Sequence, residues 1–177
     1  MKYLFYIFNV FGFKICWWAC VLGAINNQKF SGPIMIACYL IVHIICIESK
    51  FRKSEIYLLS LAAIVGTSVD TLMLNLNILS YAGMYSSAPF IAPLWITGMW
   101  VGFTATLNHA FKNIMNKYIT QAILGIVAGP IAYATGNSLG AINFNQANSD
   151  NFTLFIIAIV WGISFPFLCW ASNKIRN

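Results

Sequence analysis

Four side chains inside apolar stretches of this sequence can exchange protons or bind polar groups: Lys14, His43, Asp70 and His109. Asp70 is the most informative, because the chain has only four acidic residues and the other three lie at the edges of apolar stretches. One aspartate at the centre of a membrane helix costs about 2.5–3.5 kcal/mol on insertion scales, so it needs a partner or a function. Lys14 lies at comparable depth. We therefore expect an ion pair between Lys14 and Asp70, either as a site or as a structural link.

Asn108 and His109 lie together near one end of the fourth apolar stretch. We expect Asp70, Lys14, Asn108 and His109 to line a polar interior that binds a ligand. Asp70 belongs to the opposite half of its own stretch, so we expect Asp70 and His109 to occupy different layers without direct contact. Motifs of the GxSxG and HExxH kinds are absent, so no catalytic residue is assigned. The five cysteines form no CxxC pair, and the sequence predicts neither a metal nor a cofactor.

Composition places these residues in a membrane protein. The chain is 60% hydrophobic and 8% charged, with a mean hydropathy of +0.76, values that differ strongly from those of soluble domains. Its net charge of +6 is spread thinly over the ends of the apolar stretches. This pattern indicates contact with a lipid bilayer and argues against a nucleic-acid partner.

Apolar runs between polar clusters predict six transmembrane helices, over residues 3–25, 31–47, 55–79, 90–111, 118–141 and 152–172. The chain, 1–177, is then a single integral membrane domain of the all-α class, a polytopic helix bundle. With the N-terminus inside, eight of the ten Lys and Arg residues fall in inner segments, whereas the outer loops carry only Lys29. The positive-inside rule therefore predicts that both termini are cytoplasmic.

Small residues on the fourth and fifth predicted helices are expected to let neighbouring backbones approach closely. They form three small-xxx-small pairs, Gly98/Gly102, Gly125/Gly129 and Gly136/Gly140. Pro130 lies within the same part of the fifth helix. Because proline removes a backbone hydrogen bond and crowds the preceding turn, we predict a kink there.

Several short stretches together resemble a known family: residues 17–24 (WWACVLGA), 69–72 (VDTL), 93–95 (PLW) with 106–109 (TLNH), and 129–133 (GPIAY). The family is domain-of-unknown-function family 2878, which comprises small polytopic proteins of the bacterial inner membrane. The resemblance covers nearly the whole chain in order. It implies a multi-pass protein of the bacterial inner (cytoplasmic) membrane with no established activity, and it favours lipid-related roles. Lys14 has no assigned place in the family pattern.

These observations favour a small membrane protein that binds or moves a small or lipophilic molecule through a polar interior site. Two alternatives stay open. The first is an intramembrane enzyme or accessory subunit in membrane-lipid modification, with His109 as acid or base. The second is a structural or assembly subunit of a membrane complex. Self-association and a different membrane-protein partner are both compatible with the sequence, and whether the protein is an enzyme is left undecided.

Overall fold

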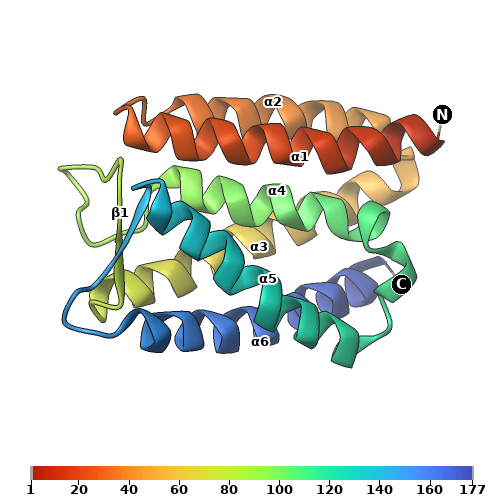
Figure 1. The fold of residues 1–177 in the computed structure, drawn as a ribbon. Coiled ribbons are helices and arrows are strands. Elements are labelled where there is room, and N and C mark those ends of the chain that lie inside the picture. The colour runs from red at the N-terminus through yellow and green to blue at the C-terminus, as the bar shows by residue number, and fades with distance from the viewer. Residues whose placement is uncertain (1, 177) are drawn as a thin grey trace.

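The structure is a computed structural model that describes residues 2–176, with side chains from residue 4 onward. The fold is all-α, with six helices running back and forth between two ends of an elongated bundle (Figure 1). The helices are α1 (Lys2–Ile25), α2 (Ser31–Cys46), α3 (Ser49–Asn75), α4 (Leu94–Ala110), α5 (Tyr118–Ser138) and α6 (Asp150–Arg176). A short 3-10 helix, η1 (Lys112–Ile114), and two short strands, β1 (Leu79–Tyr81) and β2 (Ile142–Phe144), lie in the connections.

Four of the helices, α1, α3, α5 and α6, are long and apolar enough to cross a membrane. The other two are shorter, with 16 residues in α2 and 17 in α4. Large apolar side chains such as Ile41, Ile64 and Ile131 are exposed on the outer faces, as expected for helices whose surroundings are lipid. The chain is therefore a multi-pass membrane protein, as its composition predicts.

The helix ends differ from the predicted ones where the connections have structure of their own. The third helix begins at Ser49 rather than at 55, so Glu55 lies about 1.7 turns inside it. The fourth begins only at Leu94, because Pro93 has an extended backbone and is its N-cap residue. Pro130 lies inside α5, as the sequence indicates.

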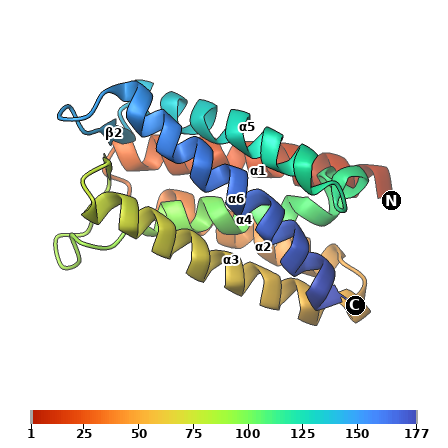
Figure 2. The ribbon, with the colours of Figure 1, turned by 90° about the horizontal axis from the view of Figure 1, so that it is seen from below.

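Helix α4 occupies the middle of the bundle (Figures 1 and 2). It packs against α1, α2 and α3, while α5 packs mainly against α6, and α6 also contacts α3. The packed arrangement thus places α4 at the centre of the core, and its buried residues include Trp95, Trp100 and Thr104. Both termini lie at the same end of the bundle, and β1 lies at the other (Figure 1).

The ends of α1, α3 and α5 share one capping arrangement. In each, the backbone reverses direction through a residue with positive φ: Asn27, Asn77 and Gly140. The amide of the following residue then donates to a carbonyl five residues back, for example Ile78 to Met73 (3.0 Å) and Ala141 to Gly136 (2.9 Å). This is the Schellman motif, which satisfies carbonyls at the end of a helix.

The short strands β1 and β2 pair in antiparallel fashion, with Ser80 opposite Asn143 and Tyr81 opposite Ile142. The alternate side chains Leu79, Tyr81, Ile142 and Phe144 are buried, and those between them are exposed. The sheet therefore joins the α3–α4 connection to the α5–α6 connection and directs Tyr81 into the bundle. Periodicity did not predict this sheet, because each strand has only three residues.

Most of the glycines predicted to mediate packing do contact another element closely. A Cβ atom on Gly98 or Gly102 would approach the Ile36 side chain to 3.2 or 2.9 Å, and one on Gly136 would approach Ile142 to 2.9 Å. The pair Gly125 and Gly129 lies against Trp161 of α6. Gly140 is different: it lies beyond the end of α5, has a φ of +79°, and nothing lies within 4 Å of its Cβ position. Its role is to cap the helix, so the packing prediction was wrong for Gly140.

Candidate functional site

Asp70 is fully buried and accepts hydrogen bonds from three side chains on three other elements. The hydroxyls of Tyr81 on β1 and Tyr133 on α5 both donate to Oδ1, the latter at 2.6 Å. The indole Nε1–H of Trp100 on α4 donates to Oδ2 at 2.5 Å. We call these four residues the Asp70 network. It connects α3, β1, α4 and α5 through one carboxylate.

Local sequence features explain why the three donors converge. Gly66 lies one turn before Asp70 on α3, and a Cβ atom there would lie only 2.0 Å from Trp100 Cγ. The absence of a side chain at Gly66 therefore lets the indole lie flat on α3 with its N–H directed at Asp70. Tyr81 reaches the same carboxylate because the pairing of β1 turns its side chain inward.

Three hydrogen-bond donors surround the Asp70 carboxyl group, and no cation pairs with it within residues 4–176. A tryptophan N–H can only donate, so Oδ2 must offer a lone pair. Burial raises the pKa of the Tyr81 phenol well above its ordinary value, so this hydroxyl keeps its proton and donates it to Oδ1. These bonds are strongest when Asp70 is ionised, because charge-assisted hydrogen bonds are about twice as strong as neutral ones. Three donors thus replace the ion-pair partner that the sequence led us to expect.

The predicted Lys14–Asp70 ion pair is absent, and this expectation is corrected. Lys14 is exposed on the outside of α1, and no ion pair involving it occurs within residues 4–176. Helix α1 packs against α2 and α4, and the side of α1 that is buried in this packing carries Cys16, Cys20 and Val21. Equal depth in two helices did not determine which faces of those helices meet.

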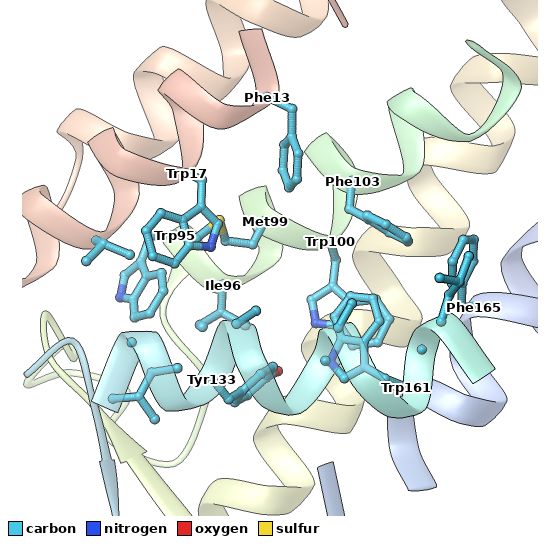
Figure 3. A pocket seen from close by; sticks show the side chains of 18 of the residues that line it. Phe13, Trp17, Trp95, Ile96, Met99, Trp100, Phe103, Tyr133, Trp161 and Phe165 are labelled. Atoms are coloured by element: carbon cyan, nitrogen blue, oxygen red, sulfur yellow. The ribbon is translucent and has the colours of Figure 1, made fainter. Parts of the chain in front are cut away.

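An apolar pocket adjoins the Asp70 network. It has a volume of about 240 Å³ and is lined by residues of α1, α4, α5 and α6, together with Phe111 and with Ile142 of β2. Figure 3 shows that aromatic rings dominate its walls: Phe13, Trp17, Trp95, Trp100, Phe103, Tyr133, Trp161 and Phe165. Trp100 and Trp161 stack with their ring centroids 4.7 Å apart and 13° between planes. The pocket therefore suits a flat or chain-like apolar molecule.

Trp100 and Tyr133 belong both to the pocket wall and to the Asp70 network. Their polar atoms are bonded to the carboxylate, so their carbon faces are what the pocket offers. Asp70 itself does not line the pocket. Asp70 therefore fits the role of a positioning residue, which holds the rings of Trp100 and Tyr133 through hydrogen bonds outside the pocket.

A second polar cluster surrounds Glu55, nearer the end that holds the termini. Glu55 is fully buried; its Oε1 lies 3.2 Å from His43 Nε2, and its Oε2 accepts from Asn108 at 3.3 Å and Arg176 at 3.4 Å. His109 contacts the His43 ring edge-on at 5.3 Å between centroids. We call this set the Glu55 cluster. Glu55 and Asp70 are 15 residues apart on α3, a rise of about 22 Å, so Asn108 and His109 are in a different layer from Asp70.

The family described as "Protein of unknown function (DUF2878)" matches residues 6–167. The chain belongs to this family. No curated protein and no solved structure matches it. The match covers all of the Asp70 network and all of the Glu55 cluster except Arg176.

In this DUF2878 protein, sequence reasoning identified Asp70, Asn108 and His109 but missed most of their partners. Glu55 is the first residue of the third predicted stretch, but in the structure it falls on the buried stripe of α3 with Leu58, Leu59, Ala62, Gly66, Asp70 and Met73. That spacing could have identified Glu55. No comparable signal pointed to Tyr81, Trp100 or Tyr133, because aromatic residues in apolar runs are usually packing residues.

Proposed function

We propose that this protein binds a small lipophilic molecule in the aromatic pocket between α1, α4, α5 and α6. The observation that carries the proposal is the pocket itself: a volume of about 240 Å³ with walls built almost entirely from aromatic and aliphatic side chains. Ligand pockets typically measure about 300–1,000 Å³, and an apolar cavity of about 150 Å³ is enough for benzene. The expected ligand is thus the size of a small ring system or a segment of acyl chain.

The arrangement of the helices supports access from the bilayer. Phe13 and Trp17 of α1 line one side of the pocket and Ala128 and Ala132 of α5 line the other. Helix α5 packs mainly on α6, and Figure 3 shows the labelled rings arranged around the space between α1 and α5. A lipophilic molecule dissolved in the membrane would enter between these two helices without crossing a polar surface.

The Asp70 network supplies rigidity to this site. Trp100 and Tyr133 each lose rotational freedom when their polar atoms bond to the carboxylate. A pocket with pre-positioned walls loses less entropy when it binds a ligand. We therefore assign Asp70 a positioning role, and we assign Lys14 no role in this site.

We also propose the membrane arrangement that accompanies this function. All six helices would cross the bacterial inner membrane, with both termini in the cytoplasm. Lys50, Lys112, Lys117 and Lys174 are among the eight bases on the inner side in this topology, and the positive-inside rule favours that orientation. Helix α2, with 16 residues, is about 24 Å long and would need local thinning of the bilayer. A phosphatase fused at Gln146 should be active outside, and one fused after Asn173 inactive.

The pocket is tested with a brominated fatty acid, whose bromine quenches nearby tryptophan fluorescence. Four tryptophans line the pocket: Trp17, Trp95, Trp100 and Trp161. Purified protein in a non-brominated detergent should show saturable quenching. Ala132→Phe places a benzyl group inside the pocket and should abolish the saturable component.

The matched control is Val127→Phe, at a residue on the same helix that is 53% exposed and does not line the pocket. The brominated fatty acid should quench the tryptophan fluorescence of this variant as it does that of the unmodified protein. Equal quenching in Ala132→Phe and Val127→Phe would show that the label acts from the detergent micelle, and the proposed site would be rejected. Far-UV circular dichroism establishes that both variants keep their helices.

A further inference from the structure

The Glu55 cluster contains a group of potential metal ligands that is separate from the pocket. His43 of α2, Glu55 of α3 and His109 of α4 each offer one ligand atom, and these atoms all lie within 4.8 Å of one another. His43 and Glu55 are fully buried, and His109 is partly buried. We propose that these three residues bind a divalent transition-metal ion at the end of the bundle that holds the chain termini.

The hydrogen bonds around His43 determine which of its nitrogens faces the site. Asn9 donates from Nδ2 to the Phe5 carbonyl (2.8 Å), so its Oδ1 is free to accept. This oxygen accepts a hydrogen bond from the Tyr39 hydroxyl at 2.9 Å. The same Oδ1 lies 2.7 Å from His43 Nδ1, which must therefore carry a hydrogen. In metal sites, a ligating histidine typically donates its second ring N–H to an oxygen in this way.

The other nitrogen, His43 Nε2, is then left facing Glu55 Oε1 at 3.2 Å. Two acceptors at that distance need one proton between them, carried either by the imidazole or by the carboxylic acid. A metal ion can take the place of this proton, because it binds the lone pairs of a neutral imidazole and an ionised carboxylate. The proton is released when the ion binds.

The third ligand is available without breaking an interaction. Nε2 of His109 is buried and has no hydrogen-bond partner among the described residues. The ring is positioned instead by edge contacts with Phe5, at 4.7 Å between centroids, and with His43. A ring held by packing can supply a nitrogen to a metal with little rearrangement.

The second oxygen of Glu55 is held separately, so the carboxylate keeps its orientation. Asn108 donates to Oε2, and Ser172 donates to Asn108 in turn, at 3.0 Å. Arg176 also lies 3.4 Å from Oε2, and its positive charge opposes a second cation nearby. The metal would therefore bind on the Oε1 side, with Arg176 reducing its affinity.

Two imidazoles and one carboxylate are a ligand set for zinc or ferrous iron, with coordination positions left over for water or a substrate. The absence of thiolates from the site matters for the test. The chain has five free cysteines, which are the competing ligands for a soft metal. Cobalt(II) distinguishes the two cases, because thiolate ligation produces an intense charge-transfer absorption and ligation by nitrogen and oxygen does not.

The experiment titrates Co²⁺ into the full chain, purified in detergent and stripped with EDTA, while the visible spectrum and the heat of binding are recorded. We expect one ion per chain with a spectrum free of thiolate absorption. His109→Phe keeps an aromatic ring against Phe5 and removes only the ligand, and it should weaken binding by more than about tenfold. Cys46→Ser, which removes an exposed thiol, is the control and should bind like the unmodified protein.

A second variant tests the location through charge. Arg176→Gln keeps all three ligands and removes the nearby positive charge, so it should bind Co²⁺ several-fold more tightly. Unchanged binding in both His109→Phe and Arg176→Gln would overturn the proposal, as would a thiolate spectrum. Neither result depends on the aromatic pocket, so the outcome is independent of the proposed lipophilic ligand.

Discussion

Replacing Asp70 by asparagine tests the description of the Asp70 network directly, because the shape is kept and the chemistry is not. Asparagine can place its oxygen toward Tyr81 and Tyr133, but its NH₂ group then faces the Trp100 N–H. Turned the other way, its oxygen accepts from Trp100, but the two phenolic hydrogens lose their acceptor. Either orientation leaves at least one buried donor unsatisfied.

The magnitude follows from the bonds that are lost. One hydrogen bond to a charged group contributes roughly 1.5–3 kcal/mol, and an orphaned buried donor costs roughly 1–3 kcal/mol. Removing a buried charge offsets part of this loss, because the carboxylate no longer has to be desolvated. We expect Asp70→Asn to lower the free energy of unfolding by about 2–4 kcal/mol.

The assay is SDS-induced unfolding in mixed micelles, followed by far-UV circular dichroism. Asp150→Asn is the matched control, since Asp150 is exposed in the first turn of α6, and its effect should stay below about 1 kcal/mol. Tyr133→Phe removes one donor of three and should cost roughly 1.5–3 kcal/mol. If Asp70→Asn proved no less stable than Asp150→Asn, the hydrogen bonds of the network would not contribute to the stability of the protein.

Three further substitutions test the packing. Gly66→Ala puts a Cβ atom 2.0 Å from Trp100 Cγ, so the indole must leave the carboxylate, and unfolding experiments should show a loss of roughly 2–4 kcal/mol. Gly125→Ala places a Cβ atom 2.2 Å from the Trp161 carbonyl oxygen, a backbone atom that can move only with α6; thermal denaturation should reveal a cost of about 3 kcal/mol. Lys14→Met should change the free energy of unfolding by less than about 0.5 kcal/mol, because Lys14 is exposed. A large loss of stability would instead support an ion pair between Lys14 and Asp70.

The helices could be predicted from the sequence because each one is a property of a continuous segment. Apolar length and polar boundaries are local, and the six predicted segments overlap the six helices. The short strands were missed because their stability comes from pairing between residues such as Ser80 and Asn143, which are far apart in the chain. Local patterns contain no information about such a partner.

The candidate site was predictable only in part, for a related reason. The rarity of an intramembrane carboxylate identified Asp70, but the identity of its partners depends on which helix faces meet. The sequence led us to expect a charged partner for Asp70, whereas its partners in the structure are hydrogen-bond donors on residues that are usually classed as hydrophobic. Trp100 and Tyr133 combine an apolar body with a polar atom, so they can satisfy Asp70 and still line an apolar pocket.

The spacing of the Asp70 network along the chain has a consequence for biosynthesis. Tyr81, Trp100 and Tyr133 follow Asp70 by 11, 30 and 63 residues, so a ribosome delivers the acid before any of its donors. At roughly 5–20 residues per second, the last donor emerges about 3–13 s after Asp70. Throughout that interval Asp70 of α3 lacks at least one of its three hydrogen-bond donors. The network can therefore be completed only after α5 has been synthesised.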